Sequence, residues 1–276
     1  MNTSTLKKDF EAQQQSTPST GSTAGRRRGL PMWVAQSAAL ALFAAAWELV
    51  ARHGVIDPLF IGTPTKILRY LYEQLFLSPA LVMDTFWTLA GTALAFVGGS
   101  LAGIATGLVF VTYPVIEKFC EPFLSALNAM PRIALAPLFL LWFGLGLGSK
   151  VALGFSLTYF IVLSSTVAGA RSVDRDFLVL ARTMGASPSK IFTRITLISA
   201  IPTLFSGLRL GLIYSLLGVI AGEIIAAQHG LGQRLSYLAG TFQIDGVFAV
   251  LILLAVLGTA LMYGMSALEK RLIRWR

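Results

Sequence analysis

Four polar residues lie within long apolar stretches of this 276-residue chain, where polar and ionisable groups are costly. Asn128 and Arg132 flank Pro131 in one stretch. Arg209 and Glu223 lie in another. We expect them to line a solute pathway or to form buried pairs, because a charge at membrane depth must face water or a partner. Arg209 and Glu223 are 14 residues apart, about 21 Å along a helix, so they cannot pair with each other. Alternatively, Arg209 extends to the cytoplasmic interface.

The sequence contains no recognisable catalytic pattern. GxSxG and HExxH are absent, and no acidic cluster suits a divalent metal. The glycine-rich run 144–150 (GLGLGSK) is not a P-loop, since no Ser or Thr follows its lysine, and we expect a tight external turn there. With one cysteine, Cys120, and two histidines, a zinc or iron site is not expected. We therefore predict no catalytic, cofactor or metal residues, and an energy source in an ion gradient or a partner.

Composition places the chain in a bilayer. Hydrophobic residues make up 55% of it, charged residues only 13%, and the mean hydropathy is +0.72, which is too apolar for an ordinary soluble domain. Six stretches have the length of a membrane span. They are residues 32–50, 86–111, 123–147, 151–170, 203–227 and 247–268. We predict an all-α membrane protein with six transmembrane helices.

The basic residues set the predicted orientation. With the N-terminus in the cytoplasm, 15 Lys and Arg lie inside: five in the N-terminal tail, one after the second span, five in residues 171–202 and four after the last span. Five lie outside: Arg52, Lys66, Arg69, Lys150 and Arg234. This bias explains the net charge of +9 without a nucleic-acid partner and places both termini in the cytoplasm.

The chain divides into a tail and a transmembrane domain. Residues 1–29, rich in Ser, Thr, Gln and Lys, have little to bury and are predicted to be a disordered tail before a domain of residues 30–276. Three arginines before the first span are also typical of a signal peptide, but about 19 apolar residues suit a retained span. Residues 63–76 are predicted to form an amphipathic helix on the outer surface.

Small residues and prolines indicate how the spans pack. Glycines recur every four residues, a spacing that lets helix backbones approach closely. The repeats are Gly99, Gly103 and Gly107, then Gly207 and Gly211, and Gly218 and Gly222. Pro131 and Pro137 predict a kinked or broken third span, and broken helices can line a substrate path.

Residues 171–202 have the pattern of a helix-turn-helix between the fourth and fifth spans. Asp174 or Asp176 can cap a first helix, and Gly185 stands where a glycine would end it. Ser187, followed by a proline, can cap a second helix. A solvated linker is the alternative, although linkers rarely carry two sets of caps and two apolar faces.

The stretch 180–202 resembles the cytoplasmic EAA loop of binding-protein-dependent ABC importer permeases. Ala181 matches the second alanine, Gly185 the glycine, and two later apolar positions match Ile195 and Leu197. Three positions depart from that pattern, at Val179, Leu180 and Ile198, and a proline comes only at Pro202. Other segments resemble the nitrate, sulfonate and taurine branch, namely residues 62–65 (GTPT), 129–148, 207–211 (GLRLG), 221–223 (AGE) and 230–232 (GLG).

The resemblance implies a type I ABC importer transmembrane domain in a bacterial inner membrane. Two permease chains, usually identical, would form the pathway, and two ATPases would bind ATP and Mg and dock on the loop. An external binding protein would deliver a small anion such as a sulfonate, taurine, nitrate or bicarbonate. The implied coupling residues are Ala181, Arg182, Thr183, Met184, Gly185, Ala186 and Ser187. The alternative is a secondary transporter driven by an ion gradient, a class that often shows inverted repeats and paired midplane charges.

The orientation can be tested by thiol labelling. In a chain with Cys120 changed to Ser, a Ser187→Cys thiol should react with an impermeant reagent only from the cytoplasmic side. A Gln233→Cys thiol should react only from outside, because the positive-inside bias places these segments on opposite sides. The reverse labelling pattern would rule out this topology.

Overall fold

The computed structural model describes residues 32–54 and 58–272, and every regular element in these ranges is a helix. The all-α prediction is confirmed. The predicted tail, residues 1–29, lies outside the described residues. The elements are α2 (Met32–Arg52), α3 (Pro58–Ile61), α4 (Pro64–Tyr72), the π-helical η1 (Glu73–Leu77), α5 (Ala80–Thr112), α6 (Pro114–Ala129), the 3₁₀ turn η2 (Arg132–Leu135), α7 (Ala136–Phe143), α8 (Leu147–Arg171), α9 (Arg175–Thr183), α10 (Pro188–Ile191), the π-helical η3 (Phe192–Thr196), α11 (Leu197–Ile225), α12 (Leu231–Gly240) and α13 (Ile244–Leu272).

The chain divides into two compact units, residues 1–46 and 47–276. The described part of the first unit is the N-terminal portion of α2, an apolar helix. The second unit contains the end of α2 and all the other described helices. The features discussed below all lie in the second unit.

The predicted third span is broken. Within the described residues, five helical segments are long and apolar enough to cross a membrane: α2, α5, α8, the run 188–225 and α13. In place of a helix over 123–147, α6 ends at Ala129 and is followed by η2 and α7 at an angle of 87°. Met130, between them, is extended at φ −72°, ψ 134°, because the following proline disfavours helical geometry. The predicted break is confirmed, but its boundaries were wrong.

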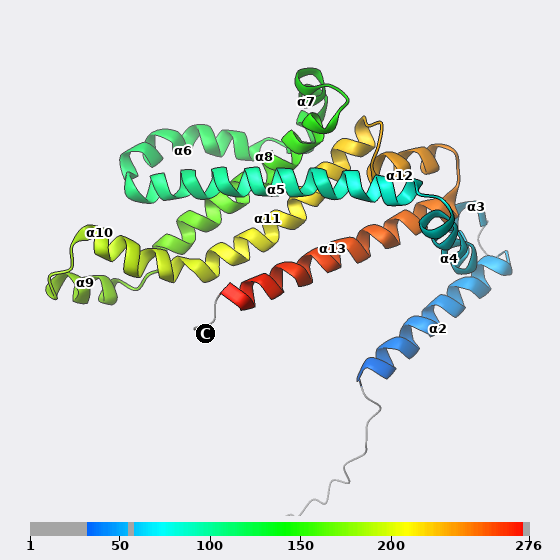
Figure 1. The fold of residues 1–276 in the computed structure, drawn as a ribbon, viewed down its shortest axis with the longest axis horizontal. Coiled ribbons are helices and arrows are strands. Elements are labelled where there is room, and N and C mark those ends of the chain that lie inside the picture. The colour runs from blue at the N-terminus through cyan, green and yellow to red at the C-terminus, as the bar shows by residue number, and fades with distance from the viewer. Residues whose placement is uncertain (1–31, 55–57, 273–276) are drawn as a thin grey trace, which may run out of the picture. The chain divides into compact units, whose positions relative to one another are not determined.

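Close contacts of α5 and α11 with α8 form the centre of the second unit (Figure 1). A Cβ at Gly103 of α5 would lie 2.7 Å from the carbonyl oxygen of Tyr159 in α8. A Cβ at Gly218 of α11 would lie 2.7 Å from the Cα of Gly154 on the same helix α8. No side chain fits at either position, so the predicted close approach of glycine-bearing helices is confirmed.

Buried hydroxyl groups join the same helices. Thr158 of α8 donates a hydrogen bond of 3.1 Å to the carbonyl oxygen of Gly211, and Ser215 of α11 donates one of 2.8 Å to that of Thr92. All four residues are buried, so these bonds act where water does not compete. They fix the rotation of α11 relative to α8 and α5.

The predicted amphipathic helix is present and lies at the end of the unit that carries α12. Its residues Leu71 and Leu75 pack against a buried cluster formed by Leu81, Leu231, Leu238 and Val250. The backbone N–H of Thr63, at its N-terminus, donates to the Asp245 carboxylate at 2.8 Å. This ties α4 to α13.

The helix contact can be tested with two glycine substitutions. Gly103→Ala should lower the free energy of unfolding by about 1–3 kcal/mol, because the new methyl group meets backbone atoms that cannot move aside. Gly264→Ala on α13 is the control, since nothing lies within 4 Å of its added Cβ. Equal thermal midpoints for the two purified variants would contradict this account.

Candidate functional site

The first candidate site is the turn between α9 and α10, here called the α9–α10 hairpin (residues 171–196). Asp174 caps α9 by accepting a hydrogen bond of 3.0 Å from the N–H of Asp176. Gly185 has φ +78°, the left-handed conformation predicted for a glycine that ends a helix. Ser187 accepts from the N–H of Lys190 at 3.4 Å, which caps α10. The sequence therefore predicted the caps of this hairpin correctly.

One face of α9 is apolar and unpacked. Phe177 is 64% exposed, Leu180 56% and Met184 79%. The opposite side faces the bundle, where Leu178 and Ala186 line a cavity of about 440 Å³ that reaches the ends of α5 and α8. Exposed apolar side chains gathered on a short helix outside the spans are typical of a protein contact.

The second half of the hairpin differs from the prediction. The sequence analysis treated the helix capped by Ser187 and the span of residues 203–227 as two elements, but α10, η3 and α11 form one helical run of 38 residues, Pro188–Ile225. Pro202 lies inside α11, and the π-helical segment η3 precedes it in the same helical run. A proline inside a helix leaves a carbonyl group of the preceding turn without its N–H partner, but the run continues through it. The hairpin is thus directly continuous with the fifth span.

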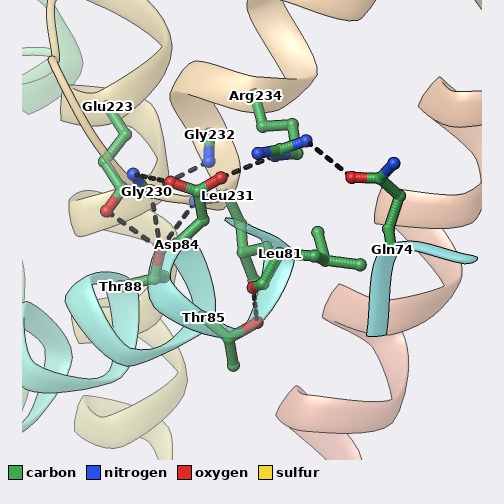
Figure 2. A network of polar contacts seen from close by, with 10 residues as sticks. All are labelled: Gln74, Leu81, Asp84, Thr85, Thr88, Glu223, Gly230, Leu231, Gly232 and Arg234. Atoms are coloured by element: carbon green, nitrogen blue, oxygen red, sulfur yellow. Dashed lines mark hydrogen bonds and ion pairs between the residues drawn. The ribbon is translucent and has the colours of Figure 1, made fainter. Parts of the chain in front are cut away.

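The second candidate site lies at the opposite end of the long helices, where α12 follows α11 (Figures 1 and 2). Glu223 of α11 is only 1% exposed. Its carboxylate accepts from the Thr88 hydroxyl at 2.9 and 3.0 Å and from the N–H of Gly232 at 2.9 Å. The carboxylate is thus held by groups of this same chain.

Asp84, one turn before Thr88 on α5, continues this network. It accepts from the N–H of Gly230 at 3.1 Å and from the Arg234 guanidinium at 2.5 Å (Figure 2). Burial lowers the pKa of Arg234, but the hydrogen bonds and charges of Asp84 and Tyr70 together outweigh burial and hold this pKa above its ordinary value. Thr88 also accepts from the N–H of Leu231 at 2.9 Å. We call this set the α12 network; it comprises Asp84, Thr88, Glu223, Gly230, Leu231, Gly232 and Arg234.

Two glycines allow the chain between α11 and α12 to pass close to Glu223. Gly230 has φ +119°, and a Cβ there would collide with the carboxyl group of Glu223. A Cβ at Gly232 would lie 2.7 Å from the Cβ of Glu223. Lys150 of α8, 4% exposed, adds a hydrogen bond of 2.9 Å to the carbonyl oxygen of His229. The connection from α11 to α12 is therefore fixed to both α5 and α8.

The other three polar candidates, Asn128, Arg132 and Arg209, have different surroundings. Arg209 is half-buried and pairs with Glu269, near the C-terminal end of α13. Arg132 of η2 donates to the carbonyl oxygen of Ser156 and to the Asn128 side chain, the latter at 2.6 Å. The structure brings Asn128 and Arg132 together and keeps both apart from the α12 network.

Sequence reasoning missed two members of the α12 network, Asp84 and Arg234, and the neighbouring Lys150. The second span was expected to begin at residue 86, which left Asp84 in a loop, although Asp84 and Thr88 share one face of a helix. Lys150 and Arg234 were treated only as external charges. Among residues 32–54 and 58–272, no three His, Cys, Asp or Glu side chains gather in a way that could hold a metal.

The long apolar helices define a multi-pass membrane protein. A family model for the inner membrane component of binding-protein-dependent transport systems matches residues 95–274, and the chain belongs to this family. It is therefore a multi-pass protein of the inner membrane.

Relatives agree with this assignment. The formylaminopyrimidine transport permease protein ThiX of Halalkalibacterium halodurans is 33% identical over 235 residues, which cover 83% of this chain and 91% of ThiX. The taurine transport system permease protein TauC of Escherichia coli is 30% identical over 240 residues, 86% of this chain and 87% of TauC. The resemblance to the nitrate, sulfonate and taurine branch is thus confirmed.

A solved structure shows the same fold. The inward-facing MetNI methionine ABC transporter matches with a TM-score of 0.62 and 20% identity, over 71% of this chain and 97% of that chain. The predicted type I importer fold is confirmed. The roles of the hairpin and of the four polar candidates remain predictions.

A double-mutant cycle can test the α12 network. Glu223→Ala and Thr88→Val should each lower the free energy of unfolding by about 1–3 kcal/mol, because the first removes the acceptor of the Gly232 N–H and the second that of the Leu231 N–H. The double variant should lose at least about 0.5 kcal/mol less than the sum, since both substitutions remove the same bonds. Ser236→Ala, at an exposed position of α12, is the control.

Transport assays separate this structural role from a role in the pathway. If Glu223 acts in the pathway, Glu223→Gln will assemble with its ATPase but take up solute poorly. The buried hydrogen bonds instead predict that Glu223→Gln and Glu223→Ala lose assembled complex and uptake in parallel. Uptake into vesicles, normalised to assembled complex, distinguishes the two roles.

Proposed function

We propose that this chain is the membrane subunit of an ATP-driven importer, which forms the solute pathway and couples it to two partner ATPase subunits. Binding and hydrolysis of ATP and Mg belong to those partners in this proposal. The observation that carries it is the exposed apolar face of α9 at Phe177, Leu180 and Met184. A helix with such a face suits a groove on a partner protein.

The continuous helix from α10 to α11 provides the mechanical connection. When ATP brings the two ATPases together, each would carry the α9 helix docked on it. Because the run Pro188–Ile225 has no break, that displacement would tilt or shift the fifth span as one body. Such rigid-body movements of helices are a common way of switching between inward and outward access.

The other proposed partners are a second copy of the chain and an external solute-binding protein. No residue of α6 is buried, although α6 belongs to a membrane-crossing pair, and this supports a second copy of the chain beside it. We propose a homodimer with both termini in the cytoplasm. The α12 end would then face outward and receive the external solute-binding protein.

The solute we propose is a small anion such as a sulfonate, taurine, nitrate or bicarbonate. TauC is named for taurine transport and shares the branch with this chain. Within this chain the support is Arg132, which has no carboxylate partner in the described ranges. A cation placed in this way favours an anionic ligand.

Substitution of Gly185 tests the coupling role. Gly185→Val should strain the left-handed turn by roughly 1–2 kcal/mol and change the angle between α9 and α10. Gly240→Val is a matched control, because neither glycine has an atom within 4 Å of its added Cβ and only Gly185 has a positive φ. We expect the Gly185 variant to insert normally but to lose copurifying ATPase and solute-stimulated ATP hydrolysis. If both variants retained the ATPase and its activity, the hairpin would not be the ATPase contact.

A further inference from the structure

The helical segment formed by α4 and η1 (residues 64–77) is not one of the membrane-crossing segments found in the described residues. One side of this segment is covered by the bundle, where Leu71 and Leu75 pack against the buried cluster contributed by α5, α12 and α13. Ile67, one turn before Leu71, is buried on the same side. These apolar residues fix the segment to the other helices.

A second apolar side of the same segment is uncovered. Leu68, Tyr72 and Phe76 follow one another at intervals of four residues, and they are between 61% and 76% exposed. The ring centroids of Tyr72 and Phe76 are 5.3 Å apart, so the two rings share one side of the segment. We call these three residues the outer stripe. Contiguous apolar and aromatic side chains of this kind are unfavourable in water, so the outer stripe requires a covering partner.

The third side of the segment is charged. Arg69 and Glu73 form an ion pair of 2.7 Å, and the Arg69 side chain is 80% exposed. Lys66 is exposed on the same side. Because successive residues of a helix are turned by about 100°, the outer stripe lies between the side covered by the bundle and this charged side. The segment therefore has one apolar flank and one charged flank that the bundle leaves uncovered.

The contact with α13 shows the depth of this segment in the membrane. α13 has 29 residues and a length of about 44 Å, which exceeds the hydrocarbon thickness of about 30 Å by about 7 Å at each end. Val250, in the cluster on which the segment packs, lies six residues after Ile244, or about 9 Å from the start of α13. This end of the unit also carries α12 (Figure 1). The segment thus lies at the boundary between hydrocarbon and headgroups.

We propose that α4 and η1 form an interfacial anchor, in which the outer stripe inserts into the surface of the bilayer at the α12 end of the unit. The occupant of the uncovered apolar flank is lipid, with acyl chains against Leu68 and Phe76 and headgroups near the Tyr72 hydroxyl. Tyrosine suits this depth because its ring is apolar and its hydroxyl is polar, while the charged flank stays in water. The anchor requires neither an ATPase nor a solute, so it stands apart from the proposed function.

The anchor acts on the connection between α11 and α12. The segment packs against Leu231 and Leu238 of α12, and Gln74 of η1 accepts a hydrogen bond of 3.3 Å from the Arg234 guanidinium (Figure 2). A segment held at a fixed depth in the bilayer surface therefore holds α12 at that depth. The α12 network gains a reference point in the membrane, while the α9–α10 hairpin at the other end has no such attachment in this proposal.

Collision measurements on spin labels test the anchor. In a Cys120→Ser background, Leu68→Cys, Tyr72→Cys and Phe76→Cys each place a nitroxide on the outer stripe. Arg69→Cys places one on the charged flank of the same turn and is the matched control. The full-length chain in lipid nanodiscs is exposed to oxygen, which concentrates in hydrocarbon, and to a neutral nickel chelate, which stays in water. The readout is the ratio of the oxygen to the nickel collision rate at each label.

Lipid contact gives a distinct pattern of the two rates. The ratio at positions 68 and 76 should be at least about threefold the ratio at position 69, because a polar chelate is excluded from hydrocarbon and reaches only the charged flank. A ratio on the outer stripe no higher than that at position 69 would place the stripe in water, as expected of a seat for a solute-binding protein, and would overturn the anchor. Low rates with both reagents would indicate a protein cover, such as a second copy of the chain, and would overturn it as well.

Discussion

The close contact of α8 with α5 and α11 is the constraint on which the rest of the second unit depends. At Gly103 and Gly218 the helices approach until no side chain fits between them, and hydroxyl groups such as Thr158 bond across the contact. In a bilayer, apolar burial does not drive helices together, so such packing and hydrogen bonds must hold them. The three helices therefore form a rigid frame.

This frame gives the two ends of the unit different properties. At the α12 end, Glu223 and Asp84 bind backbone N–H groups of the connection that follows α11 and hold it against α5. At the other end, the α9–α10 hairpin carries exposed apolar residues and continues into α11. One end of α11 is thus held in place, and the other continues into a hairpin with a surface for a partner. This arrangement suits a helix that transmits movement.

The charged groups within the spans fall into two kinds. Arg209 and Glu223 have partners inside the chain, Glu269 for the first and Thr88 with Gly232 for the second. Arg132 has only neutral partners in the described part of the chain, namely the carbonyl oxygen of Ser156 and the side chain of Asn128. A buried charge that is already paired stabilises one arrangement, whereas a charge with neutral partners can bind a ligand.

The sequence by itself determined the features that depend on local chemistry. Apolar length predicted the spans, Gly185 and Ser187 predicted the turn of the hairpin, and Pro131 predicted the break, because caps and proline sterics act within one helical turn. The tertiary structure alone decided which polar groups meet. Asp84 and Gly230 are 146 residues apart, and no periodicity encodes their contact. The continuity of α10 with α11 was also seen only in the structure, since the sequence analysis had treated the second helix of the hairpin and the fifth span as separate elements.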